Sequence, residues 1–414
     1  MDKVKSRFLQ ELQERGFIYQ TTDLNGLDDL LTKEKIAAYV GFDCTAKSLH
    51  VGSLMQIMIM RKLQQHGHKP IILLGSATTR IGDPSDKDGL RKILSDSEIE
   101  ENKKSISSIF YKFLDFSQDC PNKAEIVDNI DWLGSITYLN FLREYGVHFS
   151  INRMLTFESV KNRLDRQTQL TFLEFNYMLL QAYDFVELHK THNCKLQFGG
   201  SEQWGNIVSG IELGRKISQA ELFGVTTPLI TTSNGVKMGK TTGGAIWLNS
   251  AMLSPYDYWQ FWRNTSDADL LKFMKLYTEI PIDEINSYCN LEGKELNDLK
   301  KRLADKATSL CHGNDNAIAA RKASEKTFED KTLDSLPIVN VASGTHLYKA
   351  IVDSGLAKSN SEAKKLIIGR GVKLNDELVE DENYMLTSSG KQVKLSIGKK
   401  KHLVIQLPLT ILRK

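Results

Sequence analysis

Apolar residues in the first half of the chain gather in short runs bounded by polar residues, and these runs alternate with stretches of helical periodicity. Residues 37–42 (AAYVGF) and 70–75 predict two buried strands, and residues 49–65 between them predict a helix. A strand, a helix and a strand in this order form a βαβ unit, so we expect an α/β fold with a parallel sheet. Two further strands are predicted at 195–199 and 229–232.

Helical periodicity accounts for most of the remaining chain. Residues 1–32 predict an amphipathic helix followed by a turn, and further helices are predicted at 96–114 and 136–145. Residues 172–183 are apolar on nearly every side, so we expect this helix to be deeply buried. Periodic apolar and charged residues continue over 253–327 with almost no strand signal, which predicts a separate helical region.

The last part of the chain differs in pattern and in charge. Polar residues and Pro337 predict a linker, which we place at 331–343, and the module that follows ends in strand-like runs at 393–397 and 403–407. From residue 345 to the end, thirteen Lys and Arg stand against seven Asp and Glu, a net charge of +6, whereas the rest of the chain carries −3. A compact basic module suggests a polyanionic partner, although a solvated charged surface has the same composition.

Length and composition narrow the class of protein. A chain of 414 residues predicts two or three domains, and 41% hydrophobic with 25% charged residues is typical of a globular protein. No apolar run approaches the ~20 residues that cross a bilayer, and the N-terminus has neither the apolar core of a signal peptide nor the acid-poor pattern of a transit peptide. Five widely spaced cysteines without a CxxC pair indicate free thiols in a cytoplasmic protein and argue against a zinc site.

Three segments point to phosphate chemistry, and the first is TAKSLHVGS at 45–53, where a predicted strand gives way to a helix. Helix N-termini attract anions, Gly52 lets a nucleotide approach the backbone, and His50 can donate to a phosphate. Taken alone, a histidine at a helix start is more often a cap or a surface residue.

The second segment is KMGKT at 237–241, flanked by glycines. Two lysines three positions apart in such a loop form a mobile cationic clamp for a triphosphate, and a flexible exposed turn is the alternative. The third segment is GGSEQWGN at 199–206, in which the glycines allow close packing on a ligand and Glu202 can hold ribose hydroxyls, unless it is a plain turn. The Walker pattern GxxxxGK[ST] does not occur.

The order and separation of these segments resemble the class I aminoacyl-tRNA synthetases, and specifically the bacterial tyrosyl-tRNA synthetase family. HVGS is similar to the HIGH signature, and KMGKT is similar to the KMSKS signature. Tyrosyl-type segments also occur at 39–46, 82–85, 174–184 and 199–206, so the resemblance covers nearly the whole chain. Three positions depart from the family pattern: Ser53 replaces the last His of HIGH, Glu202 replaces an Asp, and Asp86 replaces the Gly after GDPS.

The resemblance implies three domains. They are a Rossmann-like catalytic domain at 1–225 with the tyrosine and ATP sites, a KMSKS-type loop with an α-helical domain at 226–330, and an α+β domain at 344–414. In the last domain, residues 361–375 predict a basic helix, a glycine turn and a strand, and they resemble the alpha-L RNA-binding motif of a ribosomal protein. This motif would bind tRNA(Tyr) through backbone charge and shape. The expected phosphate contacts are Lys358, Lys364, Lys365, Arg370 and Lys373.

A tyrosine pocket would lie on the apolar helix. Asp184 is the lone acidic residue on its face, which Tyr177 and Gln181 share. A buried carboxylate needs hydrogen bonds, so either a ligand or backbone groups must satisfy Asp184. By resemblance, Asp184 and Tyr39 bind the phenol hydroxyl of L-tyrosine. The resemblance also assigns the ammonium group to Tyr177, Gln181 and Asp83, and it places Gln203 near the carboxylate.

The implied reaction is activation of L-tyrosine by ATP, followed by transfer of tyrosine to the 3′-terminal adenosine of tRNA(Tyr). The tyrosine carboxylate attacks the α-phosphate itself, so catalysis rests on positioning and charge stabilisation. The expected catalytic residues are Thr45, His50, Lys237, Lys240 and Thr241. The expected ATP-binding residues are Asp43, Gly52, Ser53, Gly200, Glu202, Lys237, Met238 and Lys240. Mg²⁺ would accompany ATP, but the sequence has no visible carboxylate cage for it.

Oligomeric state and activity leave alternatives open. Residues 132–154 are similar to the family's subunit interface, which implies a homodimer. A synthetase-derived RNA-binding protein without catalysis would be consistent with Ser53 and Glu202, and a nucleotidyltransferase with an HxGH-type site is a third reading. The RNA-binding protein without catalysis conflicts with intact His50, Lys237, Lys240 and Asp184. The nucleotidyltransferase conflicts with the tyrosine-pocket residues and the RNA module.

Overall fold

The structure is a computed structural model, and it describes residues 4–84, 94–233, 235, 238–241, 244–329, 338–375, 377–387, 392–398 and 401–407. The chain divides into two compact units, residues 1–321 and 322–414.

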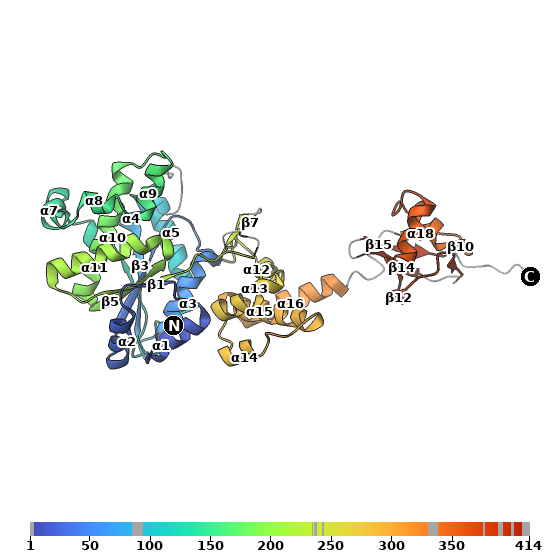
Figure 1. Ribbon diagram of the computed structural model, residues 1–414, viewed down its shortest axis with the longest axis horizontal. Helices are drawn as coiled ribbons and strands as arrows, with labels where there is room; N and C mark the ends of the chain where they lie inside the picture. The colour runs from blue at the N-terminus through green and yellow to red at the C-terminus, as the bar shows by residue number, and fades with distance from the viewer. Residues whose placement is uncertain are drawn as a thin grey trace, which may run out of the picture. The chain divides into compact units, whose positions relative to one another are not determined.

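A six-stranded sheet forms the centre of the first unit, in the order β1-β6-β5-β2-β3-β4 (Figure 1). The short β1 runs antiparallel to β6, and the other neighbours are parallel, which confirms the predicted parallel sheet. The strands are β1 (Gln20–Thr21), β2 (Ala37–Asp43), β3 (Lys69–Gly75), β4 (Glu125–Asp128), β5 (Cys194–Gly200) and β6 (Phe223–Thr227).

Two features of this sheet differ from the prediction. The strand predicted at 229–232 is wrong, because the sheet is completed by β6, which ends before Pro228. Val225, Thr226 and Thr227 are β-branched and buried, and proline cannot donate to the next rung of the ladder. The short strand β4 was not predicted at all, because four residues carry little periodic signal.

Helices cover both faces of the sheet, because successive strand residues point to opposite sides. On β2, Val40 and Phe42 join the core that contains α1 and α3, whereas Tyr39 packs with Phe185 of α10. The elements between the strands and up to the helical region are α1 (Arg7–Arg15), α2 (Leu24–Lys33), α3 (Val51–Gln65), α4 (Ser76–Thr79), α5 (Asp96–Phe110), α6 (Ile130–Leu133), α7 (Tyr138–Glu144), η1 (Gly146–His148), α8 (Ile151–Met154), α9 (Glu158–Asp165), α10 (Phe172–His192), η2 (Ser201–Gln203), α11 (Trp204–Ser218) and the hairpin strands β7 (Lys240–Thr241) and β8 (Gly244–Ala245).

Helix α10 is buried over most of its length, as the apolar pattern predicted. Thr171 and Glu174 form a capping box at its start, in which each side chain accepts the other residue's backbone N–H. The prediction fails at the first turn, where Phe172 is 70% exposed and Leu173 is 44% exposed.

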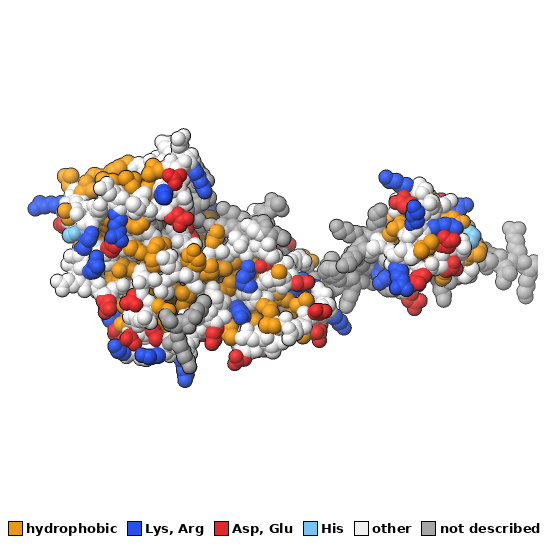
Figure 2. Space-filling model, viewed as in Figure 1, with side chains coloured by type: hydrophobic (Ala, Val, Ile, Leu, Met, Phe, Trp, Pro, Cys, Tyr) orange, Lys and Arg blue, Asp and Glu red, His pale blue; other side chains and the backbone are white. Residues whose placement is uncertain are grey.

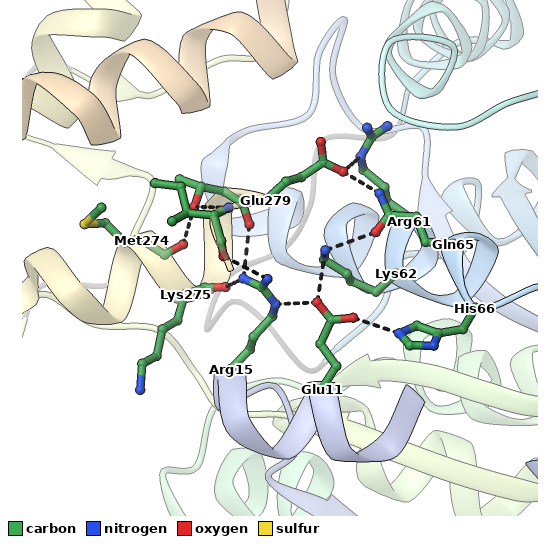
Figure 3. Close-up of polar contacts among 11 residues, drawn as sticks. Glu11, Arg15, Arg61, Lys62, Gln65, His66, Met274, Lys275 and Glu279 are labelled. Carbon is green, nitrogen blue, oxygen red and sulfur yellow. Dashed lines mark hydrogen bonds and ion pairs between the residues drawn. The ribbon is translucent and has the colours of Figure 1, made fainter. Parts of the chain in front are cut away.

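The predicted helical region is confirmed and consists of α12 (Pro255–Arg263), α13 (Asp267–Tyr277), α14 (Ile282–Asn286), α15 (Lys294–His312) and α16 (Asn314–Glu329). A charged cluster joins it to the sheet region (Figure 3). Glu11 on α1 pairs with Arg15, with Lys62 of α3 and with His66. The Arg15 guanidinium in turn donates to three backbone carbonyl groups at and beyond the end of α13.

The second unit contains a five-stranded sheet in the order β12-β11-β14-β15-β9, in which only β9 runs parallel to its neighbour. The predicted basic helix, glycine turn and strand are confirmed as α18, residues 369–371 and β11. The elements are β9 (Ile338–Asn340), β10 (Thr345–His346), α17 (Leu347–Asp353), α18 (Asn360–Ile368), β11 (Val372–Leu374), β12 (Glu377–Leu378), β13 (Met385–Leu386), β14 (Gln392–Ile397) and β15 (Lys401–Gln406).

The linker predicted at 331–343 is wrong in its second part. Strand β9 pairs with residues 404–406 of β15, so this stretch belongs to the sheet of the second unit. The pairing is with residues far along the chain, which local composition does not reveal. Residues 331–337 lie outside the described residues.

No helix in the described part of the chain is both long enough and apolar enough to span a bilayer. The five cysteines are free thiols, as predicted.

Candidate active site

The carboxyl ends of the neighbouring strands β2 and β5 lie where the strand order reverses. The sheet continues from β2 to β3 and β4 on one side and from β5 to β6 on the other. Loops that leave such a pair of strands diverge and open a crevice for a ligand. Asp43 ends β2 and Gly200 ends β5, so both predicted nucleotide-binding positions lie at this edge.

Asp184, on α10, is a fully buried hydrogen-bond acceptor. Its carboxylate oxygens accept from Trp132 Nε1 at 2.7 Å and from Asn129 Nδ2 at 3.1 Å. Burial raises the pKa of this carboxyl to about 7, against the lowering effect of the two hydrogen bonds. Both donors are side chains, not the backbone groups expected of a purely structural aspartate.

The Tyr39 hydroxyl is a buried group without a hydrogen-bond partner among the described residues. Its ring lies edge-on to Phe185, with centroids 5.2 Å apart. Burial raises the pKa of this phenol well above its usual value, and the charge of Asp184 adds to the effect. Because buried hydroxyls are almost always paired, this unpaired hydroxyl beside a carboxylate is a candidate contact for a polar group of a ligand.

A chain of hydrogen bonds connects Asp184 with the end of β2. Asn129 Nδ2, which donates to Asp184, also lies 3.1 Å from Thr78 Oγ1 and donates to it. Thr78 Oγ1 donates to Asp43 Oδ1 at 2.8 Å, and the Tyr177 hydroxyl donates to Asp43 Oδ2 at 3.1 Å. The predicted residues Asp43, Tyr177 and Asp184 therefore belong to one polar network.

A second chain joins the other predicted tyrosine-binding residues. Gln203 Nε2 donates to Asp83 Oδ2 at 2.7 Å. Asn206 Nδ2 donates to Gln203 Oε1 and to Gln181 Oε1, both at 3.0 Å. The fold thus brings Asp83, Gln181 and Gln203 together from three separate segments.

Sequence reasoning missed five polar residues of this region, which are Thr78, Asn129, Trp132, Gln197 and Asn206. Asn129 and Trp132 follow β4, and without that strand their position at the sheet edge was not visible. Gln197 stands beside Tyr39 in the register of β5 and β2, is buried, and its Oε1 has no partner in the described part of the chain. A glutamine inside an apolar strand was a signal that could have been used.

His50 caps helix α3 with its side chain. Its Nδ1 accepts the backbone N–H of Gly52 at 3.0 Å, so a neutral imidazole carries its proton on Nε2. Capping and phosphate binding therefore use different ring nitrogens and are compatible. A Cβ on residue 52 would lie 2.7 Å from His50 Cε1, so this position requires glycine.

The lysine loop lies directly on this turn. Gly239 has a φ of +87°, and a Cβ there would lie 3.0 Å from both His50 Nδ1 and Gly52 N. Ile246 N donates to Gly239 O at 3.1 Å, and Val51 N donates to Ile246 O at 2.9 Å. Two segments that are far apart in the sequence are therefore adjacent in the fold.

The remaining predicted nucleotide-binding positions are only partly described. Ser53 is half-buried in the first turn of α3, Met238 is buried, and Thr45 is exposed in the loop after β2. Glu202 folds over Gly200, since a Cβ on residue 200 would meet its carboxylate oxygens at 2.3 and 2.4 Å. Outside the described residues lie Lys237 and Asp86, and of Lys240 and Thr241 only the backbone is described.

The basic residues predicted to bind RNA lie on or beside α18 and β11, and two of them pair with acids. Arg370 Nε lies 2.9 Å from Glu380, and Lys364 Nζ lies 3.7 Å from Glu382. Lys364 also stands 4.9 Å from the centre of the Tyr348 ring. The exposed lysines Lys358, Lys365 and Lys373 complete the predicted set.

No group of three or more His, Cys, Asp or Glu side chains among the described residues is arranged to hold a metal ion.

Comparison with known proteins shows which family this chain is similar to. Residues 31–329 match the family of class I tRNA synthetases (W and Y), and residues 328–405 match the tyrosine–tRNA ligase SYY-like C-terminal domain. The tyrosine–tRNA ligase of Rickettsia conorii is 52% identical over 97% of this chain and 100% of its own length. That of Zymomonas mobilis is 53% identical over 98% of this chain and 100% of its own.

Among solved structures, the C-terminally truncated mitochondrial tyrosyl-tRNA synthetase of Aspergillus nidulans superposes with a TM-score of 0.69. It is 30% identical and covers 78% of this chain and 95% of its own.

Proposed function

The chain belongs to the class I tRNA synthetases of the tryptophan and tyrosine type, and from this premise we propose that it joins L-tyrosine to tRNA(Tyr) at the expense of ATP. The observation that carries the choice of tyrosine is the buried Tyr39 hydroxyl, which has no hydrogen-bond partner among the described residues and feels the charge of the buried Asp184 carboxylate. Asp184 already accepts from Trp132 and Asn129 but retains acceptor sites, so a phenol hydroxyl can donate to Asp184 and accept from Tyr39.

Recognition of tyrosine uses the two hydrogen-bonded chains. Asp184 and Tyr39 bind the phenol hydroxyl, and phenylalanine would leave the buried Tyr39 hydroxyl without a partner, which is costly. Tyr177, Gln181 and Asp83 hold the ammonium group, and Gln203 lies near the substrate carboxylate. Their side chains already bond to one another or to neighbours, so the pocket is formed before the substrate arrives.

Activation needs no covalent intermediate with the protein. A carboxylate oxygen of tyrosine attacks the α-phosphorus of ATP, the bond to the β-phosphate bridging oxygen breaks, and pyrophosphate leaves with the electron pair. His50 Nε2–H and Thr45 stabilise the phosphates from the α3 side, and Lys237, Lys240 and Thr241 do so from the loop. Asp43, Gly52, Ser53, Gly200, Glu202 and Met238 line the nucleotide.

In the second step, the terminal ribose hydroxyl of tRNA attacks the activated carbonyl carbon, and AMP leaves. Mg²⁺ enters with ATP as its counter-ion. The described residues offer it no protein cage, so no step is assigned to it here.

Residues 344–414 grip the tRNA, whereas residues 1–225 hold tyrosine and ATP and residues 226–330 supply the loop and the helical region. The net charge of +6 in the tail supports this division, and Lys358, Lys364, Lys365, Arg370 and Lys373 are the proposed phosphate contacts. Since Lys364 and Arg370 also have acidic neighbours, Lys358, Lys365 and Lys373, which pair with no acid among the described residues, should contribute most to RNA affinity.

A second copy of the chain is the proposed partner of an exposed apolar surface on α7, η1, α8 and the start of α10 (Figure 2). Leu139, Val147, Ile151 and Phe172 are 78%, 71%, 63% and 70% exposed, which is unusual for neighbouring large apolar residues of a monomer. Val147→Asp with Ile151→Asp should halve the mass measured by light scattering, whereas the exposed Ile318→Asp should not. A monomeric unmodified chain would refute the dimer.

The free thiols support a cytoplasmic location.

The proposed function is tested by tyrosine-dependent exchange of labelled pyrophosphate into ATP. We expect exchange with tyrosine and none above background with phenylalanine. Equal exchange with both amino acids would refute the assignment of the pocket, and no exchange would favour an RNA-binding protein without catalysis.

A further inference from the structure

Asp269 is a buried acidic residue in the first turn of α13, and its side chain is 3% exposed. Its Oδ2 accepts the backbone N–H of Ser233 at 2.7 Å and the hydroxyl of Ser266 at 2.8 Å. Its Oδ1 pairs with Lys272 Nζ at 2.9 Å. Burial disfavours the charge, but these hydrogen bonds prevail and lower the pKa of the carboxyl to about 2, so Asp269 is ionised under assay conditions.

These contacts fix the segment that leads into the lysine loop. Lys272, held by Asp269, donates from Nζ to Thr231 O at 2.8 Å. Ser233 Oγ also lies within hydrogen-bond distance of Ser266 Oγ, at 2.9 Å. Thr231 and Ser233 are thus bound to the N-cap and the first two turns of α13, just before the loop that carries Lys237 and Lys240 begins.

The exit from the loop is held by different elements. Leu248 N donates to Leu49 O at 2.9 Å, and Asn249 N donates to Ser48 Oγ at 3.0 Å. Ser48 and Leu49 immediately precede His50. The loop is therefore attached to the sheet region at its exit and to the helical region, through Asp269, at its entry.

Helix α13 is itself fixed at its other end (Figure 3). Arg15 donates to Lys275 O at 2.9 Å, to Thr278 O at 3.2 Å and to Ile280 O at 3.1 Å. Glu11 pairs with Arg15 Nε at 2.7 Å and with Lys62 Nζ of α3 at 3.0 Å. Since α3 begins at the His50 cap, α13 connects the base of the loop to the helix that presents His50.

We propose that Asp269 is a positioning residue for the lysine loop, which holds the loop entry so that Lys237 and Lys240 meet the phosphates of ATP. The inference rests on the proposed function, because it acts through those two lysines. A small misplacement of catalytic groups is costly, so loss of Asp269 should slow adenylate formation on the order of 10-fold to 100-fold. The tyrosine pocket lies on other elements, and tyrosine binding should not change.

The test is a double-mutant cycle in the full chain, with single-turnover adenylate formation and the tyrosine dissociation constant as readouts. Asp269→Ala is measured in the unmodified chain and in the Lys237→Ala/Lys240→Ala background. Asp267→Asn is the matched control: it removes the same charge from the same helical turn, but Asp267 is 65% exposed and pairs with Lys300. Asp269→Asn keeps one acceptor oxygen for Ser233 N–H and should lose less than Asp269→Ala.

We expect Asp269→Ala to slow the unmodified chain at least 10-fold, to have less than a 3-fold further effect once the lysines are gone, and to leave tyrosine affinity unchanged. Asp267→Asn should change the rate less than 2-fold. Equal effects of Asp269→Ala in both backgrounds, or a weakened affinity for tyrosine, would overturn the proposal, because they indicate general loss of structure. Failure of the proposed function would be seen separately, as an unmodified chain without tyrosine-dependent exchange, and the inference would then fall with it.

Discussion

The indole nitrogen of Trp132 donates to Asp184 Oδ1 at 2.7 Å, and it fixes a buried acceptor in the proposed tyrosine pocket. Asn129 holds the other carboxylate oxygen at 3.1 Å. Each oxygen of an ionised carboxylate has more than one acceptor site, so Asp184 can take a further donor without losing either contact. We propose that this further donor is the phenol hydroxyl of the substrate.

Asp184→Asn should weaken tyrosine binding. The variant replaces the charged carboxylate with an amide, which has fewer acceptor sites for the donors Trp132 and Asn129. Hydrogen bonds to charged groups contribute about 1.5–3 kcal/mol, or roughly 10-fold to 100-fold in affinity. Steady-state exchange kinetics should show this rise in the KM for tyrosine, with the KM for ATP unchanged. Asp131→Asn, an exposed acid on α6, is the control. Unchanged discrimination between tyrosine and phenylalanine would show that the pocket is elsewhere.

Tyrosine affinity should depend on pH through Asp184, whose pKa is about 7. Below this value the carboxyl is protonated and is a poorer acceptor, whereas above it the ionised form accepts the phenol. Binding therefore selects the ionised form, and the dissociation constant for tyrosine should fall from about pH 6 to pH 8 and then level off. Equilibrium dialysis at several pH values measures the profile. The Asp184→Asn variant should be flat, and an equally steep profile in that variant would assign the titration to another group.

His50→Ala and His50→Asn separate the two roles of this residue. Both remove the imidazole N–H that we propose donates to the phosphates, so adenylate formation should slow by ~10²–10³. Only His50→Ala also loses the helix cap, which should reduce the free energy of unfolding by about 1 kcal/mol. Rapid-quench measurements give the rate, and chemical denaturation gives the stability. A change in the tyrosine dissociation constant with a normal rate would contradict the phosphate role.

A chain that ends at Glu329 should retain tyrosine-dependent exchange and lose most tRNA charging. The cut keeps α16 whole and removes β9 together with the sheet to which it belongs. A cut after residue 341, which the predicted linker suggested, would leave β9 without its partner. Each lost phosphate contact should reduce the log–log salt slope of RNA binding by ~0.7–0.9. Normal tRNA charging by the shortened chain would show that the residues after Glu329 are not the RNA-binding domain.

The sequence predicted the parallel sheet well because β2 and β3 contain apolar runs and β5 alternates apolar and polar residues before its glycines. It misplaced the strand at 229–232 and missed β4 and β9, because short strands take their stability from pairing with distant neighbours. The same limit applied to the site. Asp184, Tyr177 and Gln181 share one helix face and were found together, whereas Asn129 and Trp132 reach Asp184 only through the unpredicted strand β4.

The contact between His50 and Gly239 also lay beyond local sequence reasoning. Each segment carried a recognisable pattern, but only the fold brings Gly239 Cα close enough that a Cβ would clash with the ring of His50. Salt bridges such as Arg370 with Glu380 were likewise invisible, because they depend on how a turn and a following loop fold together.

The most direct test of the account is the transfer of labelled tyrosine to tRNA(Tyr) in the presence of ATP, measured as acid-precipitable label. We expect the unmodified chain to charge tRNA(Tyr) with tyrosine, His50→Ala to do so at least 100-fold more slowly, and phenylalanine not to be transferred. Tyrosine-dependent charging that is unaffected by His50→Ala, or no charging of tRNA(Tyr) at all by the unmodified chain, would contradict it.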